Sequence, residues 1–107
     1  MVGRLQEEEA PIDEAIVNEV VELTPEWWRS AALEVTYSSE DGIEKYAHVI
    51  SSLDGHKEPV VPSDKLYAAT HDLGSLFRRD GKHWKRVRYE IRLQDDGSWK
   101  YTVAFEY

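Results

Sequence analysis

The stretch "WKRVRYEIRLQDDGSWKYTVAFEY", residues 84–107, decides the fold. Apolar and polar side chains alternate over residues 86–93 and again over residues 99–107. This is the period of two of a β-strand with one buried face. The Asp-Asp-Gly between the two segments is typical of a tight turn. The stretch therefore predicts an antiparallel hairpin with one apolar face.

The apolar face of this hairpin is long and largely aromatic. It comprises Val87, Tyr89, Ile91, Leu93, Trp99, Tyr101, Val103, Phe105 and Tyr107. An apolar sheet face has to be covered by another layer of structure. The upstream sequence should therefore supply helices that pack on it.

Two upstream segments, residues 12–23 and 63–79, show the spacing of amphipathic helices. The first should end before Pro25, because the residue preceding a proline avoids the helical region. The second should begin with Ser63 as its N-cap, and within it Gly74 lacks a side chain and would let a neighbour approach closely. The apolar positions are Ile12, Ile16, Val20 and Leu23 in the first segment and Leu66, Ala69, Thr70, Leu73 and Phe77 in the second.

A second hairpin is predicted between the helices. Residues 33–39 and 42–52 alternate around a Glu-Asp-Gly turn signal, and a loop over residues 53–62 follows. The sequence thus predicts an α+β domain with one antiparallel sheet of about four strands and two main helices on one face, in the order α-β-β-α-β-β. We expect this domain to span residues 11–107, after a flexible acidic segment of residues 1–10.

Two adjacent tryptophans follow the first predicted helix. Trp27 and Trp28 stand after a Thr-Pro-Glu that favours a short turn of helix over residues 25–31. Adjacent rings point in different directions, so an amphipathic element can bury only one of them well. One ring should therefore be core and the other free.

Composition and charge restrict the function. The chain has 107 residues, 41% of them hydrophobic, a formal net charge of −8 and no cysteine. Residues 1–44 hold 2 basic and 12 acidic side chains, whereas residues 78–107 hold 8 basic and 5 acidic ones. Such a chain repels nucleic-acid phosphates as a whole and attracts basic partners. With no membrane-length apolar run and no apolar signal region, we expect a cytoplasmic protein without a membrane partner.

No pattern in the sequence points to catalysis, a cofactor or a metal. The four histidines, His48, His56, His71 and His83, lack metal-site spacing. Neither a nucleophile signature around Ser51, Ser52 or Ser75 nor a glycine-rich phosphate loop is present. We therefore expect a non-enzyme that binds no cofactor.

The basic strand offers an alternative function. Arg86, Arg88 and Arg92 should project from one strand face, with Trp84 available for stacking, as in a nucleic-acid-binding module. The simpler interpretation is a solvated face whose arginines pair with carboxylates across the sheet. The net negative charge favours the second.

The order of motifs resembles the YezG-like immunity proteins. An amphipathic helix runs into "TPEWW" and "LEVTYSS", and "LGSLFRRDGKHWKRVRYEIRLQDDGSWKYTVAFEY" matches that family's ending. The resemblance covers roughly residues 12–107. Its motif residues are Pro25, Glu26, Trp28, Phe77, Gly81, Trp84, Gly97, Trp99, Phe105 and Tyr107. Trp99 stands where the family often has Phe.

The resemblance implies an antitoxin that protects its own bacterial cell by binding a polymorphic or contact-delivered toxin domain, frequently a nuclease, as in contact-dependent growth inhibition. The family pattern also makes Trp28 the buried ring and Trp27 the free one. An acidic surface could occupy a basic nuclease site. Our candidate toxin-binding residues are exposed carboxylates and aromatic anchors, namely Glu40, Asp41, Glu44, Tyr46, Asp54, Glu58, Asp95, Asp96 and Trp27.

Overall fold

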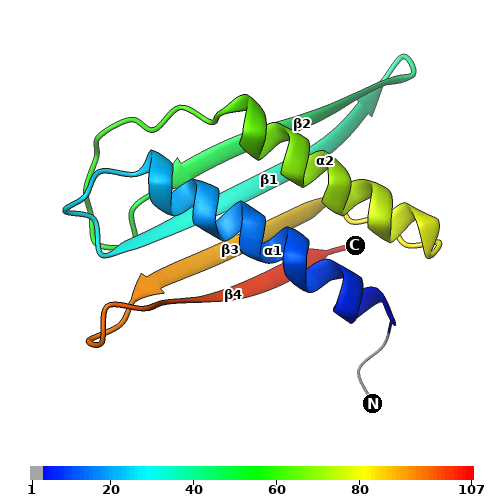
Figure 1. The fold of residues 1–107 in the computed structure, drawn as a ribbon. Helices are drawn as coiled ribbons and strands as arrows, with labels where there is room; N and C mark the ends of the chain where they lie inside the picture. The colour runs from blue at the N-terminus through cyan, green and yellow to red at the C-terminus, as the bar shows by residue number, and fades with distance from the viewer. Residues whose placement is uncertain (1–3) are drawn as a thin grey trace.

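The computed structural model describes residues 4–107 and confirms the predicted α+β fold (Figure 1). Its elements are α1 (Arg4–Leu23), β1 (Ser30–Glu40), β2 (Ile43–Ser51), α2 (Asp64–Arg79), β3 (Arg86–Leu93) and β4 (Trp99–Glu106). The strands form one antiparallel sheet in the order β2-β1-β3-β4, and both helices lie on one face of it. The other face of the sheet is open.

The core lies between the helices and the sheet, as the alternation predicted. Leu33 of β1 and Tyr89 of β3 pair directly across the sheet, and neither is exposed. They belong to one buried cluster with Ile16 of α1 and Leu73 of α2. Val87, Tyr89 and Ile91 of β3 are buried and the residues between them are not, which confirms the inward register of that strand.

The β1–β2 turn and the start of α2 have the backbone conformation and the hydrogen bond that their sequences predicted. In β1–β2, Glu40 pairs with Ile43, which leaves a two-residue turn of Asp41 at φ 53° and Gly42 at φ 79°. Positive φ at both positions is the requirement of the hairpin turn that an Asp-Gly pair favours. At the other predicted boundary, Ser63 caps α2 and its side chain accepts a hydrogen bond from the Leu66 N–H.

Two boundaries differ from the sequence prediction. Residues 4–10, expected to be flexible, form the first turns of α1, whose residue Leu5 packs against the core. Glu8 in the same segment pairs with Arg79 of α2. These two contacts stabilise the helical turns that precede Pro11, the residue near which the local sequence suggested that the helix starts. Residues 1–3 of the predicted flexible segment lie outside the described residues.

The predicted short helix over residues 25–31 is also wrong. The segment makes a single turn, in which the Trp28 N–H donates to the Pro25 carbonyl oxygen at 3.0 Å. Ser30 already belongs to β1 and pairs with Arg92 of β3. Residues from Ser30 onward therefore pair within the sheet and cannot extend the turn into a helix.

Helix α1 contacts the sheet through a buried polar group as well as apolar ones. The Tyr89 hydroxyl donates a hydrogen bond to the Asp13 carboxylate, which is 5% exposed. Glu9 lies one turn before Asp13. Burial, followed by the hydrogen bond with Asp13 and the repulsion from its charge, raises the pKa of Glu9 to about 8. Burial also raises the pKa of Tyr89.

We expect Glu9→Gln to flatten the pH dependence of stability. The folded protein keeps a proton on Glu9 that the unfolded chain releases above its ordinary pKa of 4.5. The free energy of unfolding should therefore fall as pH rises from about 4.5 to about 8. Urea denaturation across this range should show a smaller fall in Glu9→Gln than in wild type. Glu7→Gln, an exposed glutamate of the same helix, is the control, and equal slopes in all three proteins would contradict the expectation.

Candidate protein-binding surfaces

The nine predicted binding residues lie at two opposite ends of the sheet (Figure 1). The hairpin end is formed by residues 38–46 and 78–83, and the loop end by residues 24–29, 52–62 and 94–98. The hairpin end holds Glu40, Asp41, Glu44 and Tyr46, whereas the loop end holds Trp27, Asp54, Glu58, Asp95 and Asp96. Strand β1 separates the ends by roughly 35 Å at about 3.3 Å per residue. One interface of standard size would therefore use one end.

At the loop end, a carboxylate holds both tryptophans. The Glu58 side chain accepts hydrogen bonds from the Trp28 indole N–H at 3.0 Å and from the Trp27 indole N–H at 3.4 Å. The hydrogen bond from Trp28 holds the pKa of Glu58 below its ordinary value. Trp28 is 2% exposed and stacks on His56 at 5.9 Å between ring centroids, whereas Trp27 is 62% exposed. The predicted division between a buried and a free ring is confirmed.

The loop of residues 52–62, which carries Glu58, is attached to the sheet through Ser30. The Ser30 hydroxyl donates to Asp54 at 2.7 Å and accepts from the Leu53 N–H at 3.1 Å. Ser30 itself is buried, so this contact closes the start of the loop against β1. Asp54 is exposed, and its hydrogen bond to Ser30 also helps to hold the loop against β1.

The exposed part of the loop end combines apolar anchors with carboxylates. Trp27 stands next to Glu26, which is exposed and which our predicted set missed, although its position beside Trp27 in the sequence was the available signal. Val61 is 79% exposed. A groove of about 420 Å³ runs beside Trp27. Its lining residues are Trp27, Arg29, Ser30, Asp54, His56, Arg92 and Leu93.

The β3–β4 turn adds two further acids to this end. Asp96 accepts hydrogen bonds from the Ser98 hydroxyl at 2.6 Å and from the Ser98 N–H at 2.9 Å. The hydroxyl bond, followed by the backbone bond, lowers the pKa of Asp96, so this carboxylate stays charged. Asp95 is exposed and has no hydrogen bond or ion pair within residues 4–107.

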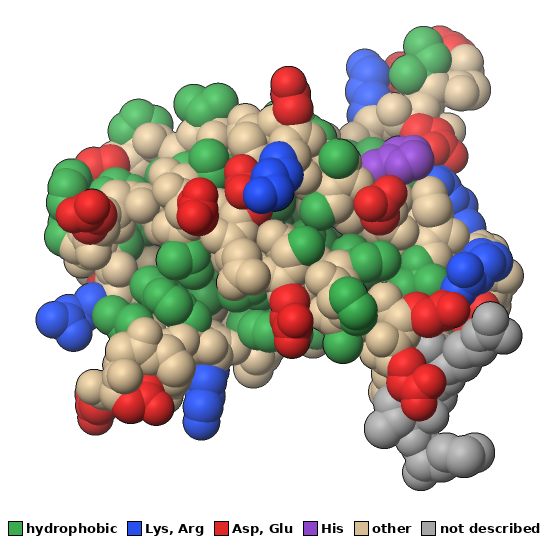
Figure 2. Space-filling model, in the orientation of Figure 1, with side chains coloured by type: hydrophobic (Ala, Val, Ile, Leu, Met, Phe, Trp, Pro, Cys, Tyr) green, Lys and Arg blue, Asp and Glu red, His purple; other side chains and the backbone are tan. Residues whose placement is uncertain are grey.

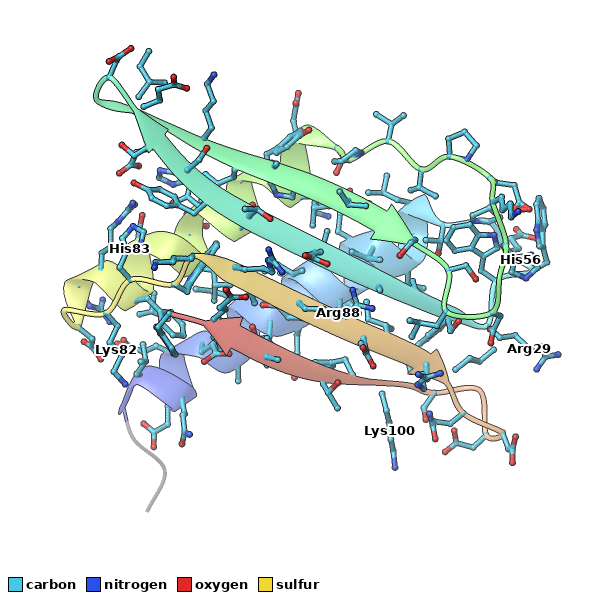
Figure 3. All side chains as sticks on the ribbon, turned by 180° about the vertical axis from the view of Figure 1, so that it is seen from behind. Arg29, His56, Lys82, His83, Arg88 and Lys100 are labelled. Carbon is cyan, nitrogen blue, oxygen red and sulfur yellow. The ribbon has the colours of Figure 1, made fainter. Side chains whose placement is uncertain are left out.

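At the hairpin end, two of the predicted residues are engaged inside the molecule. Arg78 of α2 donates to both carboxylate oxygens of Glu44, at 3.0 and 3.1 Å, and to the Tyr46 hydroxyl at 3.4 Å. Tyr46 is half-buried and packs on Trp84. Lys82 and His83 lie at this end too (Figure 3). The hairpin end therefore holds four acidic side chains and four Lys or Arg, whereas the loop end holds five acidic side chains and two Lys or Arg.

Gly74 lets Tyr46 reach this position, as the sequence suggested. A Cβ at Gly74 would lie 2.7 Å from the Tyr46 hydroxyl oxygen and 3.4 Å from its ring carbon Cζ. We expect Gly74→Ala to lower the free energy of unfolding by about 1–2 kcal/mol, because overpacking outweighs the gain in helix propensity. In a Tyr46→Phe background, which lacks the hydroxyl, at least about 1 kcal/mol of this loss should disappear. Urea denaturation of the four proteins in this cycle measures the coupling, and an equal loss in both backgrounds would refute it.

The open face of the sheet carries a ladder of paired charges. Glu34 of β1 contacts Arg86 and Arg88 of β3, each at 3.2 Å. Arg88 also contacts Glu90 at 3.0 Å, and it lies in the middle of this face (Figure 3). Arg92 lies 3.9 Å from Glu90. Each arginine of the alternative nucleic-acid surface thus has a carboxylate partner, which favours the paired sheet face.

The histidines serve separate local contacts. His48 lies 2.8 Å from the Thr70 hydroxyl and links β2 to α2. Burial lowers its pKa.

Among residues 4–107, no group of three or more His, Asp or Glu side chains has the arrangement of a metal site. In the same part of the chain, no helix has the length and apolar character to cross a membrane.

Neither a protein-family model nor a curated protein matches this sequence. The resemblance to the YezG-like immunity proteins therefore stays a prediction.

Proposed function

We propose that the protein is an immunity protein that binds and neutralises a bacterial toxin domain, a nuclease, through its loop end. The exposed Trp27, at an end of the molecule that also carries five exposed carboxylates, is the observation that supports this function most. Those carboxylates are Glu26, Asp54, Glu58, Asp95 and Asp96. A large exposed ring is the side chain that most often dominates binding energy when it enters a pocket.

The charge of the loop end suits a basic partner. A nuclease site is positively charged because it receives phosphates, and an acidic surface is steered to it and can fill the same place. The formal net charge of −8 adds long-range attraction. Inhibition would follow from occlusion of the nucleic-acid site, with no chemical step on the inhibitor.

Co-expression with a candidate toxin domain from a neighbouring gene tests this function. The protein should rescue cells that express this domain and should co-purify with it. In vitro, it should block cleavage of an oligonucleotide in proportion to the complex formed, while the protein alone should not shift the oligonucleotide. Failure to rescue would refute the proposed function, and a salt-dependent shift by the protein alone would favour the nucleic-acid-binding alternative.

Matched charge variants locate the binding end. Glu26→Gln with Asp95→Asn removes two loop-end charges, whereas Glu40→Gln with Asp41→Asn removes two from the hairpin end. The loop-end pair should slow association with the toxin domain about three- to tenfold and reduce its salt dependence. The hairpin-end pair should leave the rate near wild type. The reverse pattern would place the interface at the hairpin end.

A further inference from the structure

The sheet has two edge strands, and their free edges differ. At the β3–β4 turn, the Gln94 N–H donates to the Ser98 carbonyl oxygen at 2.7 Å. Hydrogen-bonded pairs recur at every second residue of an antiparallel ladder. The backbone groups of the even-numbered residues of β4 therefore face β3, and those of the odd-numbered residues, such as Tyr101, Val103 and Phe105, face the free edge.

No described group covers this edge of β4. Among residues 4–107, no hydrogen bond is recorded to the outward backbone groups of Tyr101, Val103 or Phe105. On the opposite edge strand, β2, the carbonyl oxygen of Tyr46 lies 3.1 Å from Nδ1 of His48, which must donate there. Strand β4 also has no proline, and its eight residues form a regular ladder with β3. It lacks most devices that keep edge strands from pairing.

We infer that β4 pairs with β4 of a second copy, antiparallel and centred on Val103, so that two sheets join across a twofold axis. Such a pairing is self-complementary, as an isologous interface requires. It places the outward backbone groups of Val103 opposite those of Val103 in the second copy. The inference is independent of toxin binding, because it uses the sheet edge and none of the loop-end residues.

Side chains agree with this register. Lys100 falls opposite Glu106 of the second copy, and Thr102 opposite Ala104, in the pairs whose side chains approach most closely. On the helix side, Tyr101 falls opposite Phe105 of the second copy. Both rings are half-buried in the single chain, and apolar atoms remain visible between α1 and this edge (Figure 2).

Lys100 lacks a carboxylate partner within the described chain. Its cross-strand neighbour on β3 is Arg92, which carries the same charge, and no ion pair of Lys100 occurs within residues 4–107. Its side chain lies at the β4 edge, apart from the charge ladder (Figure 3). Glu106 lies 3.7 Å from Arg86 of its own chain but stays exposed, so Glu106 of a second copy would supply the opposite charge for Lys100 at both ends of the twofold pairing.

The mass of the purified protein in solution tests the pairing. Light scattering coupled to size exclusion, at about 0.15 M salt where the repulsion of the two negative copies is screened, should give twice the 12.4 kDa chain mass at high concentration. A monomer at every concentration up to several hundred micromolar would overturn the inference.

A charge swap tests the register. Lys100→Glu sets like charges against each other twice and should weaken the dimer at least tenfold, whereas Lys100→Glu with Glu106→Lys should restore it. Val103→Pro removes an outward N–H, a change that edge strands tolerate, together with part of the Val103 packing against the core, and it should also give a monomer. Circular dichroism confirms that each variant is folded. A dimer that Lys100→Glu leaves unchanged would overturn the proposed edge.

Discussion

Trp28→Ala should lower the free energy of unfolding by about 3–5 kcal/mol, the usual loss for a buried large aromatic side chain. Trp28 is 2% exposed and belongs to the central apolar cluster. The variant removes that packing, the stacking on His56 and the indole donor to Glu58. A small domain has about 5–15 kcal/mol in total, so much of its stability depends on this ring.

Urea denaturation of Trp28→Ala and Trp27→Ala measures the difference between the adjacent rings. Trp27 is 62% exposed, and its indole N–H lies at the longer distance of 3.4 Å from Glu58. Trp27→Ala should therefore stay within about 0.5 kcal/mol of wild type. Similar losses in both variants would mean that the two rings share one structural role.

The fold could be predicted because its signals are local. Alternation along β3 and β4, the Asp-Gly turn before Ile43 and the Ser63 cap each depend on residues a few positions apart. The start of α1 could not be placed in this way. It depends on Leu5 meeting the core and on Glu8 meeting Arg79, a contact between residues far apart in the sequence.

The candidate site was predictable in residue type and much less so in role. A sequence shows that Glu44 is acidic and lies near a turn, but its partner Arg78 is 34 residues away. Similarly, Glu58 sits in a loop without periodicity, 30 residues from the indole of Trp28. Long-range pairing decides which carboxylates hold the fold and which, such as Asp95, are exposed without a partner within residues 4–107.

The second large effect expected is on toxin binding. Trp27→Ala should weaken the complex with the cognate toxin domain by at least about 2 kcal/mol, which is roughly 30-fold in Kd. Trp27 presents a wide apolar ring beside carboxylates that can pair with the rim of a basic site. Its long hydrogen bond to Glu58 orients the ring while leaving most of it exposed.

Ile43→Ala is the matched control for this prediction. Ile43 is 60% exposed, close to the 62% of Trp27, but it lies at the hairpin end. Calorimetric titration of both variants with the toxin domain compares the two ends, and because neither residue is buried, both variants should stay folded. A large loss in Ile43→Ala with none in Trp27→Ala would move the interface to the hairpin end. If only Trp27→Ala loses affinity, and without loss of stability, the exposed ring is an anchor for the partner and has no part in the core.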